Sequence, residues 1–60
     1  MKKKYYIVMV KIGNIDDPFD DPLDAQYTGH GYAAKWEAEI ELGRARKDYK
    51  LAWIEEREEE

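Results

Sequence analysis

Five aspartates form the densest cluster of chemically capable side chains in this sequence. They lie in and just before a tandem tetrapeptide, Asp-Pro-Phe-Asp followed by Asp-Pro-Leu-Asp, and are Asp16, Asp17, Asp20, Asp21 and Asp24. Clustered carboxylates supply the oxygen ligands that calcium prefers. The spacing lacks the glycine and the final glutamate of an EF-hand loop, and Asp-Pro pairs are ordinary turn formers. We therefore expect a long acidic loop over residues 13–31 and no metal.

Few side chains in this sequence are suited to nucleophilic catalysis. The chain has no cysteine and no serine, and Thr28 is its only threonine. His30 is the only histidine, and a single imidazole without an evident partner seldom does acid–base work. We therefore predict a protein that is not an enzyme, with no catalytic residue and no cofactor.

Gly29, Gly31 and Ala34 have the spacing of the dinucleotide-binding fingerprint. That fold needs several parallel strands with crossover helices, and the chain after Ala34 is too short to supply them. The simpler interpretation is a structural role, in which the two glycines permit a tight turn before a helix. A weaker alternative, anion or ligand binding at this turn together with the aspartate loop, stays open.

Lys2, Lys3 and Lys4 precede Tyr5 and Tyr6, a combination of cations and rings that single-stranded nucleic-acid binders use. The formal net charge of −4 disfavours binding to a phosphate backbone, so nucleic-acid binding, or acidic mimicry of nucleic acid, is kept as an alternative. The same lysines resemble the start of a signal peptide, but no small-residue cleavage site follows. We expect a cytoplasmic protein that does not enter a membrane.

Three segments are expected to form regular structure around this loop. Tyr5–Ile12 is rich in β-branched and aromatic residues and predicts a strand that is apolar on both faces. Tyr49–Glu56 predicts a closing strand, and Ala25–Thr28 a short strand inside the loop. Residues 57–60 are acidic, and we expect them to be a frayed tail.

Residues 34–47 support two interpretations. Apolar and charged residues alternate with the period of a strand, but Ala, Glu, Leu, Lys and Arg are good helix formers, and this favours a helix. In a helix, small residues line up on one stripe that suits close packing on a sheet, and Trp36 and Ile40 point away from it. The predicted fold is α+β, a two- or three-stranded antiparallel sheet with one helix on one face; the alternative is an all-β meander.

The large apolar side chains exceed what one helix can cover. The second face of the first strand then needs shielding by Ile15, Phe19 and Leu23 of the loop or by another molecule. A domain of 60 residues buries only about 60% of its surface on folding, and without cysteine it cannot add disulfides. These arguments predict a small acidic single-domain protein that binds a protein partner and forms a homodimer. The candidate contact residues are Phe19, Leu23, Trp36, Ile40 and Trp53.

Overall fold

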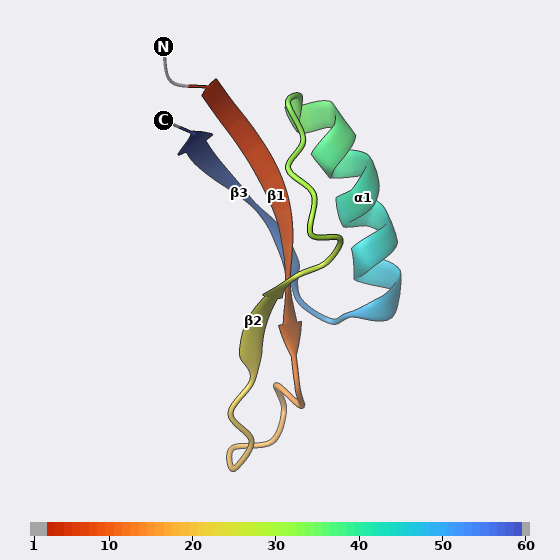
Figure 1. The fold of residues 1–60 in the computed structure, drawn as a ribbon. Coiled ribbons are helices and arrows are strands. Elements are labelled where there is room, and N and C mark those ends of the chain that lie inside the picture. The colour runs from red at the N-terminus through yellow and green to blue at the C-terminus, as the bar shows by residue number, and fades with distance from the viewer. Residues whose placement is uncertain (1–2, 60) are drawn as a thin grey trace.

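The computed structural model describes residues 3–59 and contains three strands and one helix (Figure 1). The elements follow the chain as β1 (Lys3–Ile12), β2 (Leu23–Gln26), α1 (Lys35–Asp48) and β3 (Ala52–Glu59). The strands form one antiparallel sheet in the order β2-β1-β3, and α1 covers one of its faces. The predicted α+β architecture is confirmed.

β1 is the central strand because it is the most apolar segment and needs cover on both sides. Val8 and Val10 point toward α1 and are each only 1% exposed. Across the sheet, Val8 lies opposite Ile54 and Val10 lies opposite both Ala25 and Ala52. These neighbours share the helix-facing side, since directly opposed residues of antiparallel strands point the same way. The core is therefore a narrow layer between the sheet and the helix.

Residues 35–48 are helical, so residue propensity prevails over the strand-like alternation in this segment. Ala38 and Ala45 are 0% exposed and bring the helix close to Val8 and Val10 of the sheet. The first turn contains Glu37 and the last turn contains basic residues, which suits the helix dipole. The stripe that meets the sheet is thus made of small residues, as the sequence predicts.

The acidic C-terminal segment differs from the prediction. β3 continues to Glu59, where it lies opposite Lys3, and Glu58 lies opposite Lys4. Residues 57–59 are therefore a paired strand and not a frayed tail, because the basic start of β1 supplies cross-strand partners of opposite charge. Glu60 lies outside the described residues. β3 also begins at Ala52, three residues later than the predicted start of the closing strand.

Two β1 residues on the face of the sheet away from α1 are buried, although Phe19 and Leu23 of the acidic loop do not cover them. Ile7 and Met9 are 2% and 7% exposed, although no helix lies over them. Their opposite residues on β3 are Glu55 and Trp53, whose long side chains share this face. The expectation that Phe19 and Leu23 shield this face is wrong, since both are among the exposed residues.

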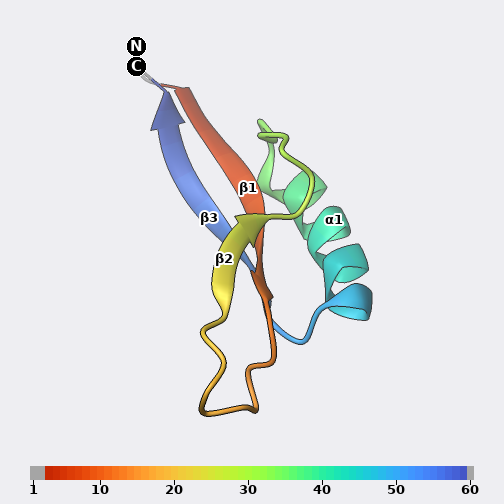
Figure 2. The same cartoon turned by 60° about the horizontal axis from the view of Figure 1, so that its bottom comes forward.

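The loop contains a short strand at residues 23–26, shifted toward the N-terminus from the predicted Ala25–Thr28. Beyond β2 the chain continues along β1, where the Tyr27 amide donates to the Val8 carbonyl at 2.9 Å. After a bulge, Tyr32 exchanges two backbone hydrogen bonds with Tyr6, each 2.8 Å long. The result is a thin molecule, 44 × 22 × 13 Å, with its helix open to solvent on the outer side (Figure 2).

Candidate functional site

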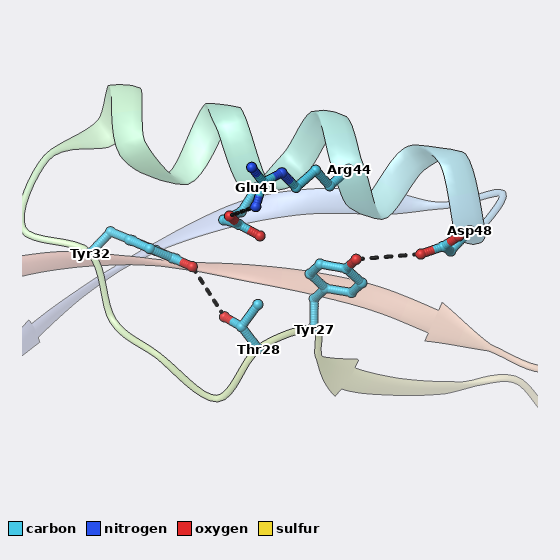
Figure 3. A network of polar contacts seen from close by, with 6 residues as sticks. All are labelled: Tyr27, Thr28, Tyr32, Glu41, Arg44 and Asp48. Carbon is cyan, nitrogen blue, oxygen red and sulfur yellow. Dashed lines mark hydrogen bonds and ion pairs between the residues drawn. The ribbon is translucent and has the colours of Figure 1, made fainter.

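Tyr27 links the segment after β2 to the C-terminal end of α1 (Figure 3). The Tyr27 hydroxyl donates to Oδ2 of Asp48 at 3.3 Å, and its ring meets Tyr49 edge-to-face with 6.1 Å between centroids. Partial burial, and then the Asp48 carboxylate, raise the pKa of Tyr27 above its ordinary value of 10.0. The phenol is the hydrogen-bond donor in this contact. The contact anchors the C-terminal end of α1 and is structural.

The Thr28 side chain and the backbone of His30 take part in local structure. The Thr28 hydroxyl lies 3.4 Å from the Tyr32 hydroxyl and accepts a bond from the His30 amide at 3.4 Å (Figure 3). Gly29 has φ +72° in the bulge between Tyr27 and Tyr32, so it serves a turn and not a strand-to-helix phosphate loop. Thr28, Gly29, His30 and Gly31 therefore belong to one excursion of the chain between Tyr27 and Tyr32.

The acidic loop contains backbone turns, and aspartate carboxylates accept hydrogen bonds from amides of these turns. Asp17 Oδ1 accepts from the Phe19 amide at 2.9 Å, and Asp20 accepts from the amides of Asn14 and Asp21. The Asp20 amide also donates to the Asp17 carbonyl at 3.2 Å, which closes a β-turn with Pro18 and Phe19 at its centre. These carboxylates are used as turn acceptors.

The remaining aspartate contacts are ion pairs at the base of the loop. Asp16 binds Lys50, and Asp24 lies 2.9 Å from Nζ of Lys11. Across residues 3–59, no group of three or more His, Cys, Asp or Glu side chains is placed to hold a metal ion. Four of the five aspartates therefore bind separate partners and do not converge, and Asp21 contributes its backbone amide to Asp20.

Phe19 is the most exposed large apolar side chain among the described residues, at 96%. It occupies the second central position of its turn, and the capping bonds to Asp17 keep it at the outer tip. Leu23, on β2, is 70% exposed. Both residues are on the surface, as expected for contacts with a partner, and acidic side chains surround them.

The outer surface of α1 carries the other exposed apolar residues that the sequence singled out. Trp36 is 61% exposed and Ile40 is 52% exposed. At about 100° per residue, these two positions lie on the side of the helix opposite the buried Ala38 and Ala45. They are neighbours one turn apart. We call this surface the outer face of α1 and define it by Trp36, Ile40, Gly43 and Lys47, which are spaced by four, three and four residues.

Trp53 does not belong to the outer face of α1. It lies opposite Met9, on the side of the sheet away from the helix, and is half-buried. Its Nε1 donates to Glu55 at 3.2 Å, and Arg57 donates to the other oxygen of Glu55 at 2.9 Å. The bonds from Arg57 and Trp53 lower the pKa of Glu55 below its ordinary value of 4.5. Trp36 and Trp53 thus lie on opposite sides of the molecule.

The basic N-terminal strand faces acidic neighbours. Nζ of Lys4 lies 3.1 Å from Glu56, and this bond, with the nearby charge of Glu58, raises the pKa of Lys4. Lys3 lies opposite Glu59. These lysines are arranged as cross-strand partners, which does not favour a phosphate-binding platform. Lys2 lies outside the described residues.

The structure also has a groove that the sequence does not reveal. It has a volume of about 440 Å³ and lies between residues 11–15 and residues 48–50. Its walls come from the end of β1 and the connection from α1 to β3, which are far apart in sequence. The Lys50–Asp16 ion pair joins its two sides.

Sequence reasoning missed the charges beside the outer face of α1. Glu37 and Glu39 flank it in the first half of the helix, and Arg44 and Arg46 flank it in the second half. The order of these charges is visible in the sequence and also suits the helix dipole. A heptad alignment of the helix is the signal that identifies these residues.

No protein-family model matches this chain, and no curated protein or solved structure proved similar to it. Within residues 3–59, no helix has the length and apolar character needed to cross a membrane.

Proposed function

We propose that this protein is a non-enzymatic protein-interaction module that self-associates through the outer face of α1. The observation that carries the proposal is the exposure of Trp36 and Ile40 directly opposite the buried stripe of the same helix. Tryptophan is costly to leave in water and is enriched at the centres of protein interfaces. The proposed occupant of this surface is a second copy of the chain.

Two features of the molecule support self-association. The outer face lies on a regular helix that is held from behind by the core and by the Tyr27–Asp48 bond, so little order is lost on binding. A 60-residue chain without cysteine also gains from burying further apolar surface, because its own core is small. The proposal includes a cytoplasmic location, since a chain without cysteine needs no oxidising compartment.

Sedimentation equilibrium over a wide concentration range tests this function. We expect a monomer–dimer equilibrium for the unchanged chain, and a weak one, because the surface offered by a single helix is small. Trp36→Ala should shift the equilibrium to monomer. The matched control is Phe19→Ala, which removes a more exposed ring from another surface and should leave dimerisation unchanged. A monomer at millimolar concentration would rule out self-association.

The Phe19 turn is a second contact surface, for a different protein with a basic rim around an apolar pocket. Its support is the combination of a 96% exposed ring and the aspartates beside it, which attract such a partner and orient it. A protein captured from lysate should be lost with Phe19→Ser and at raised ionic strength, and kept with Trp36→Ala. Binding that survives Phe19→Ser would assign the contact elsewhere.

The alternative functions are ion or ligand binding by the aspartate loop and nucleic-acid binding or mimicry. The turn-capping bonds of Asp17 and Asp20 and the cross-strand bond of Lys4 do not favour them. Titration calorimetry with calcium, magnesium, inorganic phosphate and single-stranded DNA is the direct test. Heat of binding with any of them would favour that alternative.

A further inference from the structure

The outer face of α1 has the residue spacing of the core positions in a two-helix coiled coil, with two large apolar residues in its first half and Gly43 and Lys47 in its second half. Its four residues alternate in spacing, four then three then four, so Ile40 and Lys47 take one core position of the heptad and Trp36 and Gly43 the other. The helix is 14 residues long, which is two heptads. Its side away from the sheet is open to solvent (Figure 2).

The charges on both flanks of this face fit an antiparallel partner of the same sequence. On one flank Glu37 precedes Arg44, and on the other Glu39 precedes Arg46. In an antiparallel pair, the flank with Glu37 and Arg44 lies along the same flank of the partner helix, which runs in the opposite direction. The flanks with Glu39 and Arg46 meet in the same way. Glu37 then lies beside the partner's Arg44, and Glu39 beside the partner's Arg46. The twofold axis repeats each contact, so each of the four flank charges has a neighbour of opposite charge. Arg44 is available for this contact because its side chain is 67% exposed, although it also binds Glu41 at 2.9 Å.

A parallel pair fits less well. Lys47 would then face the partner's Lys47, and like charges at a helix interface are unfavourable. In the antiparallel pair Lys47 instead lies beside the partner's Trp36, where an ammonium group gains from the face of the indole ring. The dipoles of the two helices also point in opposite directions in the antiparallel pair, which is favourable.

Gly43 gives an independent indication of this arrangement. A glycine inside a helix costs about 1 kcal/mol relative to alanine. The monomer does not require it: a Cβ atom added at Gly43 would meet nothing within 4 Å, and its φ is not positive. In the antiparallel pair Gly43 lies opposite the partner's Ile40, and the missing side chain leaves room for that residue.

From these contacts we propose that two copies of the chain pair their α1 helices antiparallel, with Ile40 on the partner's Gly43 and Trp36 on the partner's Lys47. The pairing rests on the proposed self-association and specifies its geometry. The dimer has four layers, in which two helices are packed between two sheets. Glu37 and Glu39 pair with the partner's Arg44 and Arg46 and determine the direction.

Charge reversal tests the flank contacts. One variant carries Glu37→Arg with Glu39→Arg, and the other carries Arg44→Glu with Arg46→Glu. Each alone should dimerise at least about tenfold more weakly than the unchanged chain, since four attractive contacts become repulsive. A 1:1 mixture should form a heterodimer, which also shows that both variants fold. Charge variants that dimerise as well as the unchanged chain would overturn the pairing.

Disulfide cross-linking tests whether the two helices run antiparallel. The sequence has no cysteine, so only introduced cysteines can form a disulfide. From a rise of 1.5 Å per residue, positions 39 and 46 of opposite copies lie within about 3 Å along the antiparallel axis, but about 10 Å apart in a parallel pair. A mixture of Glu39→Cys and Arg46→Cys should cross-link under mild oxidation. Either variant alone should not, because its own positions are about 7 Å or more apart along the axis. Glu37→Cys mixed with Arg46→Cys is the matched control on opposite flanks.

The outcomes separate the two proposals. A dimer in sedimentation without the 39–46 cross-link would overturn the antiparallel pairing and leave self-association intact. A chain that stays monomeric at all concentrations would overturn both. A dimer that gives the 39–46 cross-link and loses affinity on charge reversal supports both.

Discussion

Several aspartate side chains in this protein accept hydrogen bonds from backbone amides close to them in the sequence. Asp17 and Asp20 are the clearest cases, because their carboxylates accept amide hydrogens from residues within the same loop. Acidic side chains at such positions replace hydrogen bonds that the irregular backbone cannot make to itself. The chemistry suggested by five nearby carboxylates is therefore used to shape the loop that presents Phe19.

Gly13 is required by this loop. Its φ is +126°, and a Cβ atom there would lie 3.1 Å from both Oδ2 of Asp20 and Cα of Pro22. We expect Gly13→Ala to destabilise the fold by about 1–3 kcal/mol, as for other strained backbone positions. Urea unfolding measures the change. Gly29→Ala is the matched control, since its φ is +72° and its Cβ would meet nothing within 4 Å, so its cost should be smaller. Equal effects would show that contact with Asp20 and Pro22 does not matter.

Glu55 gives the stability a dependence on acid pH. Its folded pKa lies below the ordinary value of 4.5, so just below that pH the unfolded chain binds the proton more readily than the folded chain. Stability from Glu55 is therefore present above pH 4.5 and is lost as the pH falls through the folded pKa. We expect Glu55→Gln to reduce the loss of stability on acidification, measured by urea unfolding at several pH values. Asp21→Asn, in the exposed loop, is the control, and an unchanged pH profile for Glu55→Gln would contradict the assignment.

At the scale of elements, α1 places different residues on two surfaces, one that packs on the sheet and one that faces solvent. Its inner stripe of Ala38 and Ala45 permits close contact with the sheet, whereas its outer face presents Trp36 and Ile40. A helix that is apolar on two opposite sides is suited to lie between two layers. This explains how an alternation of apolar and charged residues that resembles a strand can occur in a helix.

Gly43 should have opposite effects on the monomer and on the proposed dimer, because it weakens the helix and leaves room for the partner's Ile40. Gly43→Ala should stabilise the monomer by about 0.5–1 kcal/mol, because alanine loses less backbone entropy in a helix. Urea unfolding at low concentration, where the chain is monomeric, measures this effect. At high concentration the gain should shrink, since the added methyl group crowds the partner's Ile40. A stabilisation that does not depend on concentration would indicate that Gly43 has no role in the interface.

The whole molecule is thin, and one helix covers one side of its sheet. If dimerisation buries the outer face of α1, the thermal unfolding midpoint must rise with protein concentration by mass action. We expect such a rise for the unchanged chain and a flat dependence for Trp36→Ala, followed by circular dichroism. A midpoint that is independent of concentration in both proteins would contradict a folded dimer.

The types of the elements could be predicted because they depend on local properties. The β-branched run of β1, the prolines of the loop and the helix formers of α1 each restrict the backbone over a few residues. The inward and outward stripes of the helix follow from its period alone, including the direction of Trp36 and Ile40, but the sequence left open whether Trp36 is exposed or lies along the sheet edge as part of the core. The turn around Phe19 was predictable from its Asp-Pro pairs, but the 96% exposure of Phe19 was not, since the sequence left shielding of the sheet as one role for this residue.

Other features were decided only by tertiary structure, since they depend on residues far apart in the chain. β3 reaches Glu59 because Lys3 and Lys4 lie across from it, and local composition alone indicated a frayed end. Trp53 faces away from the helix because its register places it opposite Met9. The aspartates divide between turn caps and the lysines at positions 11 and 50, which reach them only after the chain has folded. Cross-strand register and long-range ion pairs leave no periodic signal in a sequence, so only tertiary structure decided these features, whereas the period of the helix already placed Trp36 and Ile40 on its outer side.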